Sequence, residues 1–275
     1  MVVFPNCKIN LGLHILGKRP DGYHDLETVF YPVGLQDALE AILAKPTTQT
    51  EKNISFSQTG LPIAGDDSQN LCVRAWRLLK KDFPDLPGMH LHLHKAIPMG
   101  SGLGGGSADG AFALQLISRL ANLPISREKL AAYALQLGSD CPFFLLNQPA
   151  YASGRGEILE PIAIDLSAYR ILLIHPGIHI STALAFSGIR PRKPVCTLRD
   201  LPDLAISEWK QAVQNDFTEA IGRHFPPITA LINDLYQAGA LYANMSGSGS
   251  CVFGIFSELP ASLPVFPREY RVYSI

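Results

Sequence analysis

The densest group of chemically suggestive residues is a glycine-rich loop at residues 98–107, called the glycine loop below. It lies between an alternating, strand-like segment and an apolar helical segment, and it holds five glycines and two serines. Glycines let the backbone approach an anion and point successive N–H groups at it, and the positive end of a helix dipole adds to the attraction. The glycine loop is therefore predicted to bind phosphate groups, with Ser107 as the N-cap of the following helix.

Two better-known phosphate motifs fit this loop poorly. Gly100, Gly102 and Gly105 match the dinucleotide pattern, but the acidic residue expected about 20 positions later falls in a segment, residues 126–129, that is typical of a helix start. No Gly-Lys-Ser or Gly-Lys-Thr follows the glycines, so the Walker pattern is absent. A flexible connection is the structural alternative, and the helical spacing of the apolar residues at 113–121 argues against it.

An alternating segment at residues 8–15 is predicted to be a half-buried strand. Ile9, Leu11, Leu13 and Ile15 would share one face, with Lys8 and Asn10 on the other. A cation beside an amide suits a site for phosphate or hydroxyl groups, although a lysine on a strand is usually solvated.

Tyr23 and His24 follow a Pro-Asp-Gly turn. Their rings could stack on a nucleotide base or read its polar edge. Ordinary packing at a strand edge is the more common reason for such a pair.

Asp140 lies between a helix predicted over residues 127–137, ending at Gly138, and the apolar run that starts at Pro142. A carboxylate two residues before a proline usually caps a helix. Because the same chain carries a predicted phosphate loop, Asp140 is also the leading candidate for a general base.

Three histidines, His90, His92 and His94, alternate along a strand that leads into the glycine loop. Alternating histidines can bind zinc, but a zinc site needs further ligands, and the sequence has no Cys/His cluster that offers them. The preferred interpretation is the solvent face of an edge strand.

A second Gly/Ser loop occupies residues 244–251. It follows a predicted helix, residues 228–235, that ends at Gly239. Two such loops suggest one on each side of a ligand. Residues 187–203 show little periodicity and are predicted to form a loop.

Composition restricts the classes of partner. The chain has 275 residues, of which 47% are hydrophobic and 17% charged, so it can form two packed domains. A net charge of −1 gives no electrostatic footprint for nucleic acid or an anionic membrane. Five scattered cysteines without a C-x-x-C pair, and the absence of a signal peptide, indicate a reducing cytoplasm.

Three segments together resemble the signature motifs of the GHMP kinases, in the same order. They are residues 5–11, with Pro5, Lys8 and Asn10, residues 98–107, and residues 246–250. Further matches at residues 20–24, 70–71, 138–144 and 175–177 resemble the branch of this superfamily whose substrate is a methylerythritol linked to cytidine diphosphate. The resemblance extends from about residue 5 to residue 256.

The resemblance implies an α+β fold of two domains. Residues 1–155 would form an ATP-binding domain similar to domain 2 of ribosomal protein S5, with a left-handed βαβ unit, and residues 156–275 a ferredoxin-like substrate domain. The implied reaction transfers the γ-phosphoryl group of ATP to the 2-hydroxyl of the cytidylylated methylerythritol in the non-mevalonate route to isoprenoids. Mg²⁺ would accompany ATP, with no protein ligand assigned. The implied partners are these small molecules alone, without nucleic acid or membrane.

The implied site residues fall into three groups. Asp140 would take the hydroxyl proton, while Lys8 holds the acceptor and the transferred phosphoryl group. The ATP-binding positions would be Pro98, Met99, Gly100, Ser101, Gly102, Leu103, Gly104, Gly105, Gly106, Ser107, Asn70, Leu71 and Lys95. The substrate positions would be Asn10, Tyr23, His24, Phe30, Thr182, Phe186, Gly247 and Ser248, with cytosine sandwiched by Tyr23 and Phe186 and its polar edge read by His24.

Some positions depart from the family pattern, and two other functions stay open. Ala108 stands where a second serine is usual, and Arg155 stands where small or apolar residues are common, so it could contact the diphosphate or only face water. One alternative is a GHMP kinase for homoserine, mevalonate or a sugar, which Tyr23 and His24 disfavour because those substrates carry no base. The other is a non-catalytic nucleotide-binding regulator, which the presence of both Lys8 and Asp140 disfavours.

Overall fold

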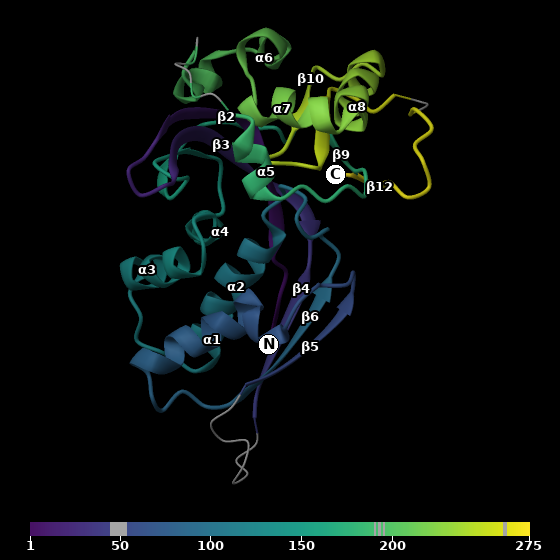
Figure 1. The fold of residues 1–275 in the computed structure, drawn as a ribbon. Coiled ribbons are helices and arrows are strands. Elements are labelled where there is room, and N and C mark those ends of the chain that lie inside the picture. The colour runs from purple at the N-terminus through teal and green to yellow at the C-terminus, as the bar shows by residue number, and fades with distance from the viewer. Residues whose placement is uncertain (45–53, 190, 192–193, 195, 261–262) are drawn as a thin grey trace. The chain divides into compact units, whose positions relative to one another are not determined.

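The computed structural model describes residues 1–44, 54–189, 191, 194, 196–260 and 263–275 (Figure 1). Its contacts divide the chain into two compact units. The first comprises Met1–Cys7, Gly34–Met99 and Gly104–Asn147, and the second comprises Lys8–Val33, Gly100–Leu103 and Gln148–Ile275. This division differs from a single cut at residue 155, because residues 8–33 and 100–103 group with the C-terminal part. The predicted domain boundary itself stays a prediction.

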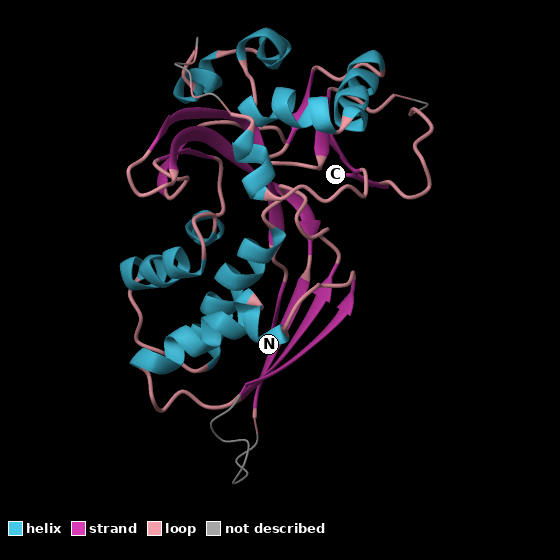
Figure 2. Ribbon diagram, viewed as in Figure 1, coloured by secondary structure: helices cyan, strands magenta, loops and turns pink. Residues whose placement is uncertain are grey.

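The first unit is a four-stranded sheet with helices packed on it (Figure 2). The strand order is β1 (Val2–Val3), β4 (Ala38–Leu43), β6 (Met89–Lys95) and β5 (Ile54–Gly60). The helices are η1 (Asp67–Gln69), α1 (Leu71–Asp82), α2 (Gly105–Leu120), α3 (Arg127–Leu137) and α4 (Cys141–Leu146). Strands β5 and β6 are parallel and α1 connects them. Since no parallel strand follows α2 beside β6 in the described residues, the dinucleotide fold is excluded.

Strand β6 explains the three histidines. Leu91 and Leu93 are buried while His90 and His94 are exposed, because alternate residues of a strand face opposite sides. The three rings bond to hydroxyl groups of Ser55, Ser57 and Thr59 on β5. The predicted solvent face is confirmed. The predicted edge position is wrong, because β6 pairs with β4 on one side and β5 on the other.

The second unit contains two four-stranded sheets. One has the order β2 (Asn6–Lys18), β3 (His24–Gln36), β7 (Ala150–Ser153) and β8 (Ile158–Pro161), with the first residues of β2 and the last of β3 in the first unit. The other is antiparallel, with the order β10 (Tyr242–Met245), β11 (Val252–Phe256), β9 (Arg170–His175) and β12 (Arg271–Ser274). Its helices are α5 (Thr182–Ser187), η2 (Leu198–Asp203), α6 (Ile206–Ala212), α7 (Asp216–His224) and α8 (Pro226–Gln237).

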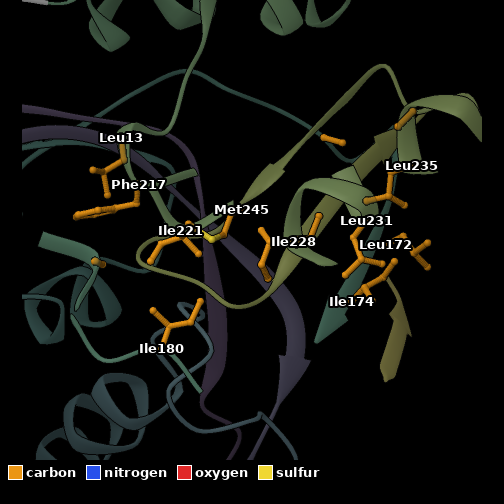
Figure 3. Close-up of a cluster of buried hydrophobic side chains, with 14 of the residues drawn as sticks. Leu13, Leu172, Ile174, Ile180, Phe217, Ile221, Ile228, Leu231, Leu235 and Met245 are labelled. Atoms are coloured by element: carbon orange, nitrogen blue, oxygen red, sulfur yellow. The ribbon is translucent and has the colours of Figure 1, made fainter. Parts of the chain in front are cut away.

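The main described core of the second unit joins β2 to the C-terminal sheet and helices (Figure 3). Leu13 and Ile15 of β2 belong to the same cluster as Leu172 of β9, Phe217 of α7 and Leu231 of α8. The prediction that residues 8–15 form a strand is confirmed. The half-buried pattern is wrong, because the polar face carrying Lys8 and Asn10 is buried as well.

The predicted end of the helix at residues 127–137 agrees with the structure, whereas the predicted loop at residues 187–203 is partly helical. Helix α3 ends at Leu137 with Gly138 as its C-cap, as predicted. Part of the predicted loop at 187–203 is the 3₁₀ helix η2, which Thr197 caps, and residues 190, 192, 193 and 195 lie outside the described residues.

In the part of the chain that the structure describes, no helix has the length and apolar character needed to cross a membrane.

Candidate functional site

Three distant sequence segments meet within the second unit. The Lys8 ammonium donates to Asn10 Oδ1 at 2.5 Å and to the Gly102 carbonyl at 2.9 Å. The Ser246 hydroxyl donates to the same Gly102 carbonyl at 2.9 Å. A Cβ atom at Gly102 would lie 1.9 Å from the Ser246 carbonyl oxygen, and the φ of +78° also favours glycine there. Residue 102 is therefore glycine because the second Gly/Ser loop packs directly against it.

Strand β2 holds Lys8 in a fixed place. The side chain is almost fully buried, and its ammonium lies 5.0 Å from the centre of the Phe30 ring. Asn10 is oriented from its other end, because its Nδ2 donates to Thr28 Oγ1 at 2.8 Å. A buried cation must be paired or hydrogen-bonded, and here uncharged oxygens provide part of that environment. Such a lysine can offer positive charge to a developing anion without reorganising.

The glycine loop leads directly into helix α2. Gly100, Gly102 and Gly104 all have positive φ, and Gly104 is the N-cap, so α2 starts with Gly105. The prediction that Ser107 caps this helix is wrong, because Ser107 lies in its first turn. A backbone of this kind presents N–H groups at a helix N-terminus, which is the geometry that binds phosphate.

Asp140 lies in the first unit, at the N-cap position of α4. Its side chain makes no capping hydrogen bond. Burial raises the pKa of the next residue, Cys141, to about 12, while a hydrogen bond with Ser107 lowers it. That bond places Ser107, on the first turn of α2, next to residues 140 and 141. Asp140 is therefore next in the chain to a residue that bonds to the first turn of α2.

The three residues predicted to hold adenine and ribose have different settings. Asn70 is half-buried and caps α1, since its Oδ1 accepts from the Cys72 N–H at 2.9 Å, and Leu71 is the first residue of that helix. Lys95 has a fully buried side chain whose ammonium pairs with Asp37 and Asp109. The ammonium is thus already paired with two carboxylates, and a role of Lys95 at adenine or ribose stays a prediction.

The predicted base-stacking residues lie in the second unit. His24 stacks on Phe186, with ring centroids 4.6 Å apart and an interplanar angle of 20°. Tyr23 is 55% exposed, and the Arg155 guanidinium lies 4.8 Å above its ring. His24, rather than Tyr23, therefore faces Phe186 in this structure. Thr182 is exposed on α5, one turn before Phe186.

The second Gly/Ser loop is held by a residue that the sequence did not reveal. Asn215 Nδ2 donates to the carbonyls of Met245 and Gly247, at 2.8 Å each. Gly247 has a φ of +54°, and a Cβ there would lie 3.2 Å from Asn10 Oδ1. Ser248 follows in the same loop. A lone asparagine outside any motif carries no signal that could have identified this role.

Matches to family models cover the glycine loop and the second Gly/Ser loop. Residues 70–148 match the model for the GHMP kinases N terminal domain, and residues 198–263 match the model for the GHMP kinases C terminal domain. The chain therefore belongs to the GHMP kinase family.

Several curated relatives share one more specific name. A Bacteroides fragilis protein named 4-diphosphocytidyl-2-C-methyl-D-erythritol kinase is 47% identical over 94% of this chain and 92% of its own length. A protein of the same name from Parabacteroides distasonis is 44% identical over 100% of this chain and 96% of its own length.

Solved structures also resemble this chain, and one of them carries the same specific name. A crystal structure of 4-(cytidine 5'-diphospho)-2C-methyl-D-erythritol kinase matches with a TM-score of 0.79 and 31% identity over 93% of this chain and 90% of that one. Homoserine kinase from Cytophaga hutchinsonii matches with a TM-score of 0.72 but only 14% identity, over 99% and 93% of the two chains, which shows the shared fold alone. The predicted two-domain GHMP kinase fold is confirmed.

Proposed function

We propose that this chain is an ATP-dependent kinase that phosphorylates the 2-hydroxyl of 4-diphosphocytidyl-2-C-methyl-D-erythritol, in the non-mevalonate pathway to isoprenoids. The observation that carries the proposal is the meeting of Lys8, Gly102 and Ser246, one from each family motif. The relatives that share the substrate-specific name at 44–48% identity support the choice of acceptor.

In the proposed reaction, the backbone N–H groups of the glycine loop and the start of α2 bind the ATP phosphates. Asp140 accepts the proton of the 2-hydroxyl, whose oxygen forms a bond to the γ-phosphorus as the bond to the β–γ bridging oxygen breaks and ADP leaves. Lys8 stabilises the negative charge on the transferred group. Phosphoryl transfer asks a protein mainly for in-line positioning and charge neutralisation, which a lysine, a carboxylate and oriented N–H groups supply.

Mg²⁺ would enter as a companion of the ATP phosphates, whose charge it would neutralise. Among the described residues, no group of three His, Cys, Asp or Glu side chains is placed to hold a metal ion. We therefore assign no protein ligand to Mg²⁺ and derive no step through it.

The aromatic residues of the second unit would recognise the cytosine. Phe186 belongs to α5 and His24 begins β3, directly after Tyr23, and the stacked His24–Phe186 pair already offers a flat aromatic surface. A base could stack there, or replace His24 against Phe186. We propose a cytoplasmic enzyme, since all five cysteines, which lie within the described residues, are thiols.

A coupled ATP-consumption assay tests this function. The purified chain is given ATP and Mg²⁺ with 4-diphosphocytidyl-2-C-methyl-D-erythritol, homoserine, mevalonate or galactose as acceptor. We expect turnover with the cytidylylated acceptor and little with the others. Preference for another acceptor would refute the substrate and keep the kinase, whereas ATP binding without turnover on any acceptor would favour a regulator.

A further inference from the structure

A buried charge cluster lies beneath the start of α2. The Lys95 ammonium contacts Asp37 Oδ2 at 2.5 Å and Asp109 Oδ2 at 2.6 Å, and all three side chains are at most 4% exposed. Asp109 comes from α2, Lys95 from the end of β6, and Asp37 from just before β4. We call these three residues the Lys95 cluster. Burying one cation with two carboxylates has a large desolvation cost, so stability alone is a weak reason for it.

The cluster connects the two ends of the glycine loop. Asp37 Oδ1 accepts from the N–H groups of Ala96 at 2.6 Å and Ile97 at 2.9 Å, the last residues before the loop. On the far side, Lys95 reaches Asp109 on the second turn of the helix that follows the loop. A Cβ at Gly105, the first residue of α2, would lie only 3.1 Å from the Lys95 ammonium. The lysine therefore lies directly under the helix N-terminus.

Burial and charge act together on Asp109. The groups around it are Lys95, Asp37 and Cys72, whose Sγ lies 3.6 Å from the Asp109 carbonyl oxygen. Burial raises the pKa of Asp109, with the nearby Asp37 acting in the same direction and Lys95 opposing both. The short contacts of Lys95 with both carboxylates therefore join the segment before the loop to the helix after it.

We propose that Asp37, Lys95 and Asp109 are positioning residues that hold both ends of the glycine loop in the geometry that binds the phosphates of a nucleoside triphosphate. This inference rests on the proposed function of the loop. It gives Lys95 an indirect role in ATP binding, through the backbone of the glycine loop. Errors of about 1 Å in such positioning cost about a hundredfold in catalysis.

The test compares Asp109→Ala with Asp109→Asn in the full chain. Calorimetry measures the affinity for a non-hydrolysable ATP analogue and, separately, for the cytidylylated acceptor. Hydrogen exchange measures protection of the Ala96 and Ile97 amides. We expect Asp109→Ala to weaken binding of the analogue about tenfold or more, to leave acceptor affinity within about twofold, and to speed exchange at both amides. Asp109→Asn, which keeps a side-chain oxygen that can accept from Lys95, should restore all three.

A matched control separates positioning from simple loss of stability. Leu79 is fully buried in α1 of the same unit, so Leu79→Ala destabilises that unit without removing a cluster residue. The inference is overturned if Asp109→Ala keeps wild-type affinity and exchange, or if Leu79→Ala produces the same loss of analogue binding. If the wild-type chain binds no ATP analogue, the proposed function fails, and the exchange comparison still decides the role of the cluster.

Discussion

At the scale of single residues, Asp140 occupies a helix cap without capping. Asp140→Asn removes the proposed base and no capping hydrogen bond, so we expect turnover to fall about a hundredfold or more while the unfolding temperature and ATP affinity change little. Steady-state kinetics and thermal unfolding of the same preparation check this. Turnover within a few-fold of wild type would leave Asp140 without a catalytic role.

Tyr23 tests the recognition of the base. Aromatic stacking contributes about 1–3 kcal/mol per base in nucleic-acid binders, so Tyr23→Ala should lower kcat/KM for the cytidylylated acceptor about tenfold to a hundredfold. The KM for ATP should stay unchanged. Tyr23→Phe keeps the ring and is the matched control. Because His24 already stacks on Phe186, an effect of His24→Ala larger than that of Tyr23→Ala would show that His24 forms the principal stacking surface.

The sequence indicated the types of residue better than it indicated their burial and their hydrogen-bond partners. The structure brings Lys8, Asn10 and Gly102 together, and motifs could indicate them because motifs record residue identity and spacing. The burial of Lys95 was missed, although its alternation with Leu91 and Leu93 placed it on the buried face of β6. Its partners Asp37 and Asp109 are distant in sequence, and no local pattern records such a pairing.

At the scale of elements, the contact between the two Gly/Ser loops depends on the absence of a side chain. Gly102→Ala would place a methyl group 1.9 Å from the Ser246 carbonyl oxygen, in a backbone conformation that alanine rarely adopts. We expect a lower unfolding temperature and weaker ATP binding. Gly17→Ala, outside the predicted site, is the control, because no atom lies within 4 Å of a Cβ there. Equal behaviour of the two variants in denaturation and calorimetry would contradict this argument.

Glu27 joins several elements of the second unit. It bonds to His14 of β2, Tyr151 of β7, Thr197 and the N–H of Leu198. Burial raises its pKa, but these hydrogen bonds outweigh burial and lower the pKa from 4.5 to about 2. A lowered carboxylate pKa stabilises the fold fully above about pH 4.5, and this stabilisation is lost as the pH falls towards 2.

Glu27→Gln should therefore lower the free energy of unfolding at pH 7 by about 3 kcal/mol, since each pKa unit corresponds to about 1.4 kcal/mol. The difference from wild type should shrink as the pH falls from 4.5 towards 2. Urea denaturation across that range measures it. A difference that does not depend on pH would show that lost packing, rather than the carboxylate charge, causes the destabilisation.

At the scale of the whole molecule, the order of the motifs along the chain predicted the fold class, but the compact units could not be read from that order. The chain passes between the units after Cys7, Val33, Met99, Leu103 and Asn147. Sequence reasoning divides a chain linearly, whereas residues 8–33 pack with strands and helices more than a hundred residues away. Long-range strand pairing and core formation decide this, and neither leaves a local signal.

Residues 156–275 depend on strand β2 for part of their core and for hydrogen bonds. A fragment of residues 156–275 would lack Leu13 and Ile15, which are buried in the core with Phe217 and Leu231. It would also lose the Leu11 carbonyl that accepts from the buried Tyr242 hydroxyl at 2.6 Å, and the Ile15 N–H that donates to Asp216 at 2.8 Å. Leaving such polar groups without partners is costly when they are buried.

We therefore expect residues 156–275, expressed without residues 1–155, not to unfold cooperatively, whereas the full chain should. Far-UV circular dichroism during urea denaturation measures this. Mixing the two fragments is the informative control, because restored cooperativity would show that residues 8–33 complete the second unit in trans. Cooperative unfolding of the isolated 156–275 fragment would instead establish it as an independent domain, with its boundary where the sequence predicted it.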